Sequence, residues 1–297
     1  MKRLERGLDT DGKAGVGSEI RYAGSETGPA VPAGASSRTG TSCCRLVWLM
    51  FLALMIGCGG NPDPQKVALS QQNSFDYNYR LGVMHLNQGN IPSAIMALQK
   101  ALTIKPEDAD GWNALGLAHF MGKQYKEALF AFQKALEVKP TFTDVHNNLG
   151  NVYNDMGLYD KAKAEYNKVL EDLTYPKPEA AYFNLATIAA VEEKYDVALN
   201  YCRLALSMNP RFARVYNLIG LINEKKGDLR EAVANYRVGL TVGPEQLELN
   251  YNLAVVLFKT KQYAESRPLF EKVVQLYPAT DQGKRSLEYL QMFAKPE

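Results

Sequence analysis

The chain has 297 residues, with 34 basic and 32 acidic side chains and a formal net charge of +2. This near-neutral balance excludes the charge-driven binding to nucleic acid or to a membrane surface that strongly basic proteins show. The 46% of hydrophobic residues is enough for a folded protein.

Residues 1–40 differ in composition from the rest of the chain. They hold eight glycines and several serines without apolar periodicity, so we expect a disordered extension, which a start codon assigned too early would explain. Residues 7–14 have the glycine and lysine spacing of a phosphate-binding loop. However, Ala14 stands where such a loop needs a magnesium-binding serine or threonine, and no strand pattern precedes it. We therefore predict no nucleotide site there.

Residues 41–57 have the features of a signal peptide. Arg45 precedes an unbroken apolar run, residues 46–56, which is too short to span a bilayer and has the length of a signal-peptide core. The alternative, a membrane-embedded or buried helix, is disfavoured by the same length. The run ends at Gly57-Cys58, and small residues follow it.

Met55-Ile56-Gly57-Cys58 resembles a bacterial lipobox. The resemblance implies that Cys58 is the first mature residue and carries diacylglycerol and an amide-linked acyl chain such as palmitate, since stable anchoring needs more than one chain. Gly59 is not the aspartate associated with inner-membrane retention. We therefore expect a periplasm-facing outer-membrane lipoprotein of a Gram-negative bacterium, with residues 58–74 as an acylated flexible tether.

Loss of residues 1–57 would change both the charge and the cysteine content. The segment carries seven basic and five acidic residues, so 27 of each would remain. Cys43 and Cys44 would leave with the signal and Cys58 would carry lipid, so Cys202 would remain alone. We therefore expect no disulfide framework in the mature chain.

Prolines recur through the remaining chain at a nearly fixed period. They stand at positions 106, 140, 176, 210, 244 and 278, with intervals of 34 residues except for one of 36. Each ends a stretch with helical patterning, because proline cannot continue a helix. A period of this length predicts an all-α solenoid of six helix-turn-helix repeats over residues 75–280, followed by a C-terminal capping helix over residues 281–297.

Other residues recur at fixed offsets within each period. In the second repeat they are Trp112, Leu115, Gly116, Ala128, Phe132, Ala135 and Pro140. This pattern resembles the tetratricopeptide repeat, in which small residues let the two helices approach and large apolar residues fill the space between them. The resemblance implies that the chain is a binding scaffold.

In this architecture the first helix of each repeat lines a groove through its second, fifth, sixth, ninth and twelfth positions. The groove residues predicted in this way are Tyr79, Val83, Asn113, Leu117, Phe120, Asn147, Asn148, Asn151, Phe183, Asn184, Asn217, Tyr251 and Asn252. An asparagine amide offers a donor and an acceptor to an extended peptide backbone, and the apolar residues offer pockets. We expect a protein partner there. The alternative, that the asparagines only cap helices or face water, stays open.

The sequence offers little for catalysis. His85 and His119 occupy the same offset in adjacent repeats, but a metal site needs more ligands than this, and packing in place of tyrosine is the simpler interpretation. No zinc-protease, serine-hydrolase or Cys-x-x-Cys motif is present. We therefore predict no enzyme activity, no metal and no cofactor; an enzyme with a hidden site at the two histidines is the competing interpretation.

The 36-residue interval contains a Tyr175-Pro176 insertion. Residues 173–186, together with residues 148–153, resemble the outer-membrane lipoproteins of type IV pilus biogenesis, the PilF/PilW/Tgl group. The resemblance implies a pilotin, which binds a secretin subunit and assists its localisation and assembly at the outer membrane. The alternative is a general cell-envelope adaptor that recruits cell-wall hydrolases or polysaccharide-export components.

Overall fold

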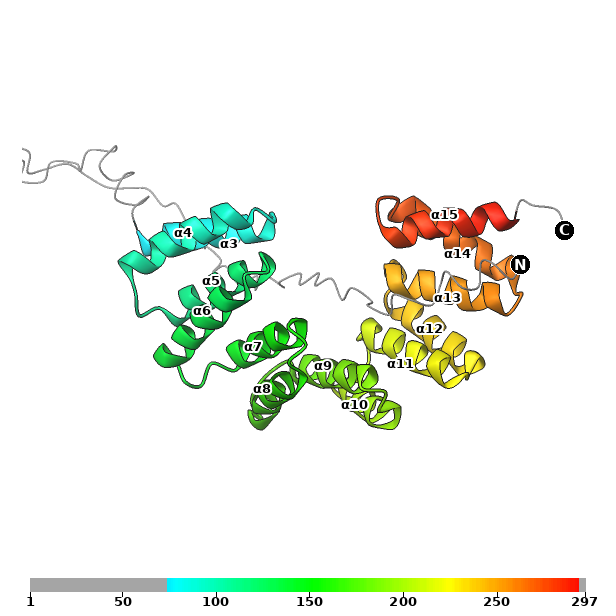
Figure 1. The fold of residues 1–297 in the computed structure, drawn as a ribbon, viewed down its shortest axis with the longest axis horizontal. Helices are drawn as coiled ribbons and strands as arrows, with labels where there is room; N and C mark the ends of the chain where they lie inside the picture. The colour runs from blue at the N-terminus through cyan, green and yellow to red at the C-terminus, as the bar shows by residue number, and fades with distance from the viewer. Residues whose placement is uncertain (1–73, 294–297) are drawn as a thin grey trace, which may run out of the picture. The chain divides into compact units, whose positions relative to one another are not determined.

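The structure is a computed structural model that describes residues 74–293, and all regular elements in that range are α-helices (Figure 1). The chain divides into two units at Pro106. The described part of the first unit is residues 74–106, and that of the second is residues 107–293. The predicted extension, signal peptide, Cys58 and tether lie outside the described residues, apart from Ser74.

The described part of the first unit is one helical hairpin, α3 (Phe75–Asn87) and α4 (Ile91–Ile104). The Ser74 side chain caps α3 by accepting a hydrogen bond from the Tyr77 amide at 3.2 Å. The turn between the helices contains Gly89 at φ +72°, a backbone conformation that glycine adopts without strain. This short turn makes α3 and α4 antiparallel neighbours.

The second unit repeats the hairpin five times and adds a single helix, within the residues that the structure describes. Its helices are α5 (Ala109–Met121), α6 (Tyr125–Val138), α7 (Thr143–Asp155), α8 (Tyr159–Glu171), α9 (Pro178–Val191), α10 (Tyr195–Met208), α11 (Ala213–Lys226), α12 (Leu229–Val242), α13 (Leu247–Lys259), α14 (Tyr263–Leu276) and α15 (Asp281–Phe293). The odd-numbered helices from α5 to α13 are the first helices of the predicted repeats. The all-α solenoid prediction is therefore confirmed.

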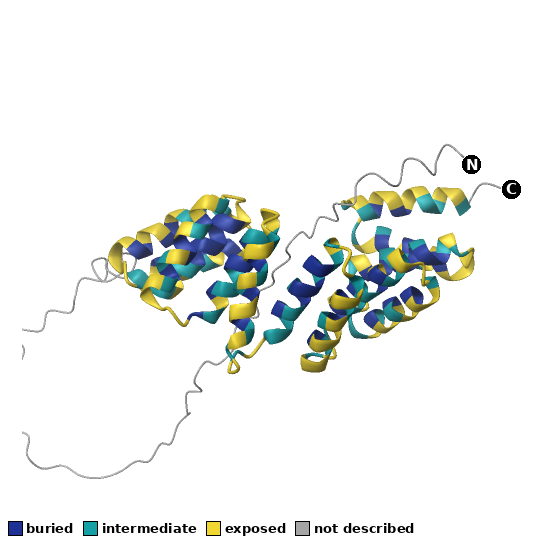
Figure 2. Ribbon diagram, turned by 60° about the horizontal axis from the view of Figure 1, so that its bottom comes forward, coloured by how far each residue is buried: buried dark blue, intermediate teal, exposed yellow. Residues whose placement is uncertain are grey.

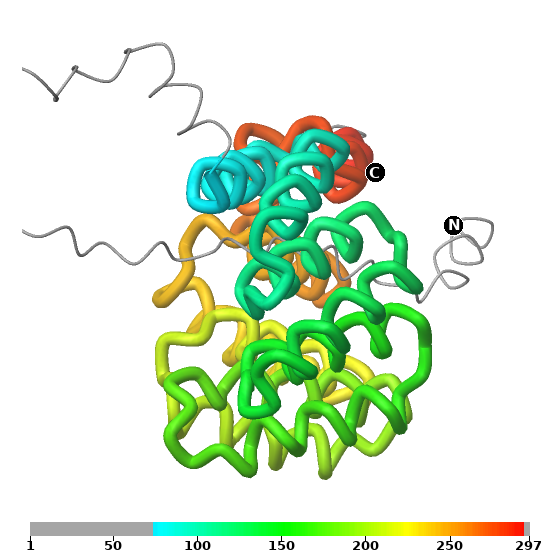
Figure 3. Tube along the Cα trace, turned by 90° about the vertical axis from the view of Figure 1, so that its left-hand side faces the viewer, coloured from blue at the N-terminus to red at the C-terminus, as the bar shows by residue number. Residues whose placement is uncertain are grey.

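The helices of the second unit stack in a regular order. Each odd-numbered helix from α5 to α13 contacts the next odd-numbered one, and each even-numbered helix contacts only its own partner and the helix that follows it. Figure 3 traces these successive turns along the chain. Odd-numbered helices of successive repeats contact one another directly, whereas even-numbered helices of the second unit do not contact other even-numbered helices. The odd-numbered helices therefore lie closer together and form one face of the unit, which we call the inner face.

Within a hairpin the two helices interlock at a glycine. A Cβ atom added to Gly116 would lie 2.6 Å from the Phe132 ring, and one added to Gly150 would lie 2.4 Å from the Tyr166 ring. The same contact at Gly220 and Tyr236 would be 2.2 Å. Each ring therefore occupies the space that a glycine leaves open on the facing helix.

Successive hairpins pack through small clusters of buried residues. Val145 and Val152 on α7 join Phe132 and Ala135 on α6, and equivalent clusters form at the next three junctions of the second unit. Figure 2 shows buried residues on the helix sides that face one another, with exposed residues outside. The core is therefore a series of local layers along the stack.

The 36-residue interval forms an ordered turn between α8 and α9. Asp172 accepts hydrogen bonds from the Thr143 hydroxyl at 2.5 Å and from the Thr174 hydroxyl at 2.6 Å, and these bonds hold its pKa below the ordinary value. The Tyr175 hydroxyl donates to Asp144 at 2.8 Å. Leu173, between these anchors, is 95% exposed.

Aromatic rings attach the last helix, α15, to the hairpin before it. The Tyr289 ring stacks on Phe270 with 4.6 Å between centroids, and Phe293 meets Phe258 edge to face at 5.4 Å. Leu287, on the same helix, is 45% exposed. The structure thus has a helix where the capping helix was predicted. No helix between residues 74 and 293 has the length and apolar content needed to cross a membrane.

We predict that Gly150→Ala destabilises the protein. In an open helix this change would add about 1 kcal/mol of stability, because alanine has the higher helix propensity. Here the methyl group would overlap the Tyr166 ring, and such overpacking costs about 1–3 kcal/mol. Denaturant unfolding should show a lower midpoint for Gly150→Ala. The exposed control Asn167→Ala should show an equal or slightly higher midpoint, because alanine also has a higher helix propensity than asparagine. A higher midpoint for Gly150→Ala would contradict the interlock.

Candidate peptide-binding groove

Asparagine side chains on the inner face bind one another across repeats. The Asn148 amide donates to Asn113 Oδ1 at 2.9 Å, which joins α7 to α5. The Asn252 amide donates to Asn217 Oδ1 at 2.9 Å and joins α13 to α11 in the same way. In both pairs, the fifth residue of one repeat meets the sixth residue of the next.

The junction between α7 and α9 pairs differently. Asn184 donates to Asn151 Oδ1 at 3.1 Å, and the Tyr166 hydroxyl donates to the same oxygen at 2.8 Å. Burial raises the pKa of Tyr166, so its hydroxyl stays protonated and remains a donor. The neighbouring Asn147 does not join this arrangement, and its Oδ1 is buried without a hydrogen-bond partner among the described residues. Asn151 is therefore fixed both by the next repeat and by the core of its own repeat.

Three predicted groove residues belong to the core instead. Leu117 and Phe120 are 6% and 7% exposed within the cluster that joins the second and third repeats. Phe183 is 8% exposed and packs against Phe212 with 5.2 Å between ring centroids. These side chains are covered because neighbouring helices and the loop at Phe212 supply large apolar groups. A partner on the inner face would not reach them directly.

The remaining predicted residues of the second unit are partly exposed on the inner face. They are Asn113, Asn147, Asn148, Asn151, Asn184, Asn217, Tyr251 and Asn252. Two arginines that the prediction missed lie beside this set. The Arg214 guanidinium covers the Phe183 ring at 4.7 Å, and Arg285 on α15 hydrogen-bonds Tyr251. Arg214 stands at the second position of its repeat, which was the signal that could have identified it.

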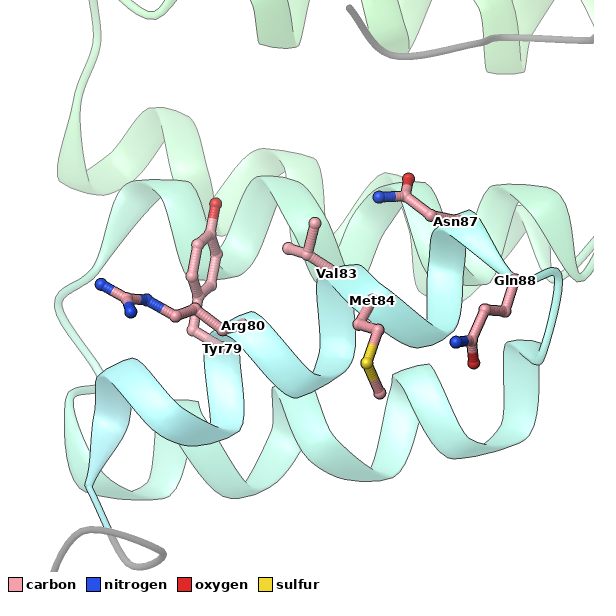
Figure 4. A pocket seen from close by; sticks show the side chains of 6 residues that line it. All are labelled: Tyr79, Arg80, Val83, Met84, Asn87 and Gln88. Atoms are coloured by element: carbon pink, nitrogen blue, oxygen red, sulfur yellow. The ribbon is translucent and has the colours of Figure 1, made fainter. Parts of the chain in front are cut away.

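The two predicted residues of the first unit, Tyr79 and Val83, line an open hollow along α3 (Figure 4). Its other lining residues are Arg80, Met84, Asn87 and Gln88. Five of the six lie on α3 and Gln88 is its C-cap residue, so within the first unit this site is a shallow surface. It mixes polar tips with apolar stems, as a peptide-binding surface does.

The histidines do not form a metal site with other residues of the described chain. His119 is 9% exposed and its Nδ1 lies 2.6 Å from Gln124 Oε1, so it is occupied within its own hairpin. His85 lies in the other unit, and its Nδ1 is buried. Between residues 74 and 293 no cluster of three or more histidine, cysteine, aspartate or glutamate side chains could hold a metal ion.

Family models match most of the repeat region in overlapping pieces. The model described as "Tetratricopeptide repeat" matches residues 109–142 and a second one with this description matches residues 131–164. A "TPR repeat" model matches residues 82–122, and the "Tetratricopeptide repeat protein 21 C-terminal ARM domain" matches residues 158–287.

Curated relatives match only over parts of their length. The chain is 31% identical over 96 residues to "Probable biofilm formation methyltransferase WspC" of Pseudomonas putida, which is 32% of this chain and 22% of that protein. It is 24% identical over 110 residues to tetratricopeptide repeat protein 21B of Xenopus laevis, which is 37% of this chain and 8% of that protein. These matches identify the repeat and do not extend to the whole proteins.

Solved structures share the fold over a longer span. Pseudomonas aeruginosa PilF matches with a TM-score of 0.60 and 21% identity over 72% of this chain and 97% of that chain. PilW, described as a widely conserved type IV pilus biogenesis factor, matches with a TM-score of 0.62 and 18% identity. The match covers 72% of this chain and 98% of the PilW chain. Yeast Tom70 also matches with a TM-score of 0.62 and 19% identity, over 77% of this chain and 50% of the Tom70 chain. The similarity at these identities is one of fold.

We predict that Asn217 and Asn252 are energetically coupled. A double-mutant cycle of Asn217→Ala and Asn252→Ala should give a coupling of about 0.5–1 kcal/mol in the free energy of unfolding, the range of a single hydrogen bond between neutral groups. The matched control pairs Asn113→Ala with Asn252→Ala, whose amides belong to different pairs and whose effects should add. Equal coupling in the two cycles would show that the asparagines do not act in pairs.

The geometry and the comparisons therefore agree on the class of protein. Helical hairpins interlock at glycine, stack through layered clusters and present one inner face of paired asparagines. Models of the tetratricopeptide repeat match residues 82–164, which include Gly116, Gly150 and the pair of Asn113 and Asn148. The chain is a tetratricopeptide-repeat scaffold with a fold similar to those of two type IV pilus proteins, PilF and PilW.

Proposed function

We propose that the inner face of the second unit binds an extended segment of a protein partner. The observation that supports this most is the row of paired asparagine amides on α5, α7, α11 and α13. Each pair uses one donor of one amide and one lone pair of the other, whereas an amide group has two donors and two lone pairs. The rest of each group can bind a peptide backbone, and the pairing fixes its orientation before the ligand arrives.

Apolar side chains on the same face would supply pockets for the partner's side chains. Leu221 on α11 is 36% exposed, and Val255 on α13 is half-buried. Both stand at the ninth position of their repeats, one turn from the paired Asn217 and Asn252. Alternation of a fixed amide with an apolar site suits an extended chain, whose side chains point to alternating sides.

We further propose that Cys58 is acylated and that the scaffold is a pilotin, which binds a secretin subunit at the outer membrane. This proposal rests on the lipobox-like sequence and on the extent of the similarity, since the fold match covers nearly the whole of the PilF and PilW chains. An anchor of this kind confines captured subunits near the membrane and raises their effective concentration. No chemical step is needed.

Leu221→Asp should weaken partner binding. Placing a carboxylate on the inner face removes an apolar contact and adds a charge that a bound segment must desolvate, so we expect a loss of about tenfold or more in affinity for the secretin subunit. The matched control is Val238→Asp on the outer helix α12, where the side chain is 43% exposed. Titration of both purified variants should leave the control within about twofold of the parent chain. Equal losses would contradict binding at the inner face.

Replacing Cys58 tests the anchor. A Cys58→Ala strain should lose the heat-stable secretin multimer from the outer membrane, because the unlipidated scaffold cannot retain subunits there. Fractionated membranes can be compared by immunoblot with a Cys202→Ala strain, whose buried cysteine carries no proposed lipid. Normal multimer in the Cys58→Ala strain would overturn the pilotin proposal. Co-purification of a cell-wall hydrolase or an export component in place of a secretin would favour the envelope-adaptor alternative.

A further inference from the structure

Each first helix of the second unit from α7 to α13 buries two of its positions against the helix that precedes it. On α7 these positions are Val145 and Val152, which pack against Phe132 and Ala135 of α6. The corresponding residues of the later first helices are Ala181 and Ile188, Val215 and Ile222, and Leu249 and Val256. All eight side chains are at most 1% exposed. Burial of the third and tenth positions by a preceding helix is therefore a rule of this stack.

The first described repeat departs from this rule. Its third and tenth residues are Tyr77 and Met84 on α3, and they are 43% and 44% exposed. Met84 is also part of the hollow in Figure 4. Two large apolar side chains thus stand at the positions that a preceding helix covers in the four later cases.

The sequence directly before α3 continues the repeat. Gln65-Lys66-Val67 stands 34 residues before Gln99-Lys100-Ala101, and Val67 also stands 68 residues before Ala135 and 102 before Val169. The side chains of Ala101, Ala135 and Val169 are fully buried on α4, α6 and α8. Asp63-Pro64 precedes this stretch, and a capping residue followed by proline is a helix-start signal.

We propose that residues 63–73 dock against the side of α3 that carries Tyr77 and Met84, as the second half of an additional repeat. The register places Val67 at the position of Ala101, so that it would lie against this side of α3. It places Leu69 at the position of Thr103, Glu137 and Glu171, which are exposed on α4, α6 and α8. In this register Val67 would face the repeat and Leu69 would face solvent.

The docking would change how the scaffold is held at the membrane. If residues 58–74 were a flexible chain, the span would reach about 55 Å at about 3.5 Å per residue. With residues 63–73 docked, only residues 58–62 would separate Cys58 from the folded part, a reach of about 17 Å. This consequence rests on acylation of Cys58, whereas the docking itself does not.

Oxidation of methionine by hydrogen peroxide tests the docking locally. Met84 and Met96 on α4 are 44% and 70% exposed, so without a covering segment their rates should agree within about twofold. We expect Met84 in the full chain to oxidise at least about fivefold more slowly than Met96, as measured by mass spectrometry of peptides. In the Val67→Asp variant the oxidation rates of Met84 and Met96 should again agree within about twofold, because a buried carboxylate opposes docking.

The matched control is Leu69→Asp, which makes a similar change two residues away on the side expected to face solvent. It should leave Met84 protected. Circular dichroism of each variant will show that the repeats remain folded. The proposal is overturned if Met84 and Met96 oxidise at similar rates in the full chain, or if Val67→Asp and Leu69→Asp have equal effects. Neither result depends on lipidation or on partner binding.

Discussion

The contact between a glycine on the first helix and a large ring on the second is the constraint on which the hairpins depend. At Gly116, Gly150 and Gly220 the helices approach so closely that even a methyl group would overlap the facing ring. In the fourth repeat the residue on the first helix is larger and the residue on the second helix is smaller: Ala186 stands opposite Cys202 at the equivalent positions. In the sixth repeat Ala254 stands opposite Phe270, and both side chains are fully buried. What recurs in each repeat is thus a small residue on the first helix, which lets the two helices pack closely.

The inner face follows from that geometry. Because each hairpin has the same shape, successive first helices meet at the same points, and the fifth residue of one repeat lies beside the sixth residue of the next. Two junctions fill this point with an asparagine pair, whereas the junction between α9 and α11 fills it with Phe183 and Leu218, which share one apolar cluster. The same place in the fold can therefore hold a polar or an apolar contact. The residue type at this position can vary without a change of fold, so the sequence can adapt the inner face to a particular partner.

The fold could be predicted from the sequence because its cause is local and repeated. The proline period marks where each hairpin ends, and the small residues mark where helices approach, so both signals lie within 34 residues of each other. The groove was only partly predictable. Which side an amino acid faces follows from its offset, but whether it is covered depends on the size of neighbours in another repeat, as Phe212 covers Phe183. The pairing of Asn113 with Asn148 depends likewise on a partner 35 residues away.

The repeat fold alone does not select a function, since PilF, PilW and yeast Tom70 match this chain with almost equal TM-scores. Selectivity must come from features added to the repeat. The insertion after α8 is a feature added to the repeat. Its turn is ordered because Asp172 accepts a hydrogen bond from Thr143 at the start of α7 and Tyr175 donates one to Asp144. These bonds fix the turn around the fully exposed Leu173. An apolar side chain presented on a fixed turn loses little conformational entropy when a partner covers it, which is the property that an anchor residue in an interface requires.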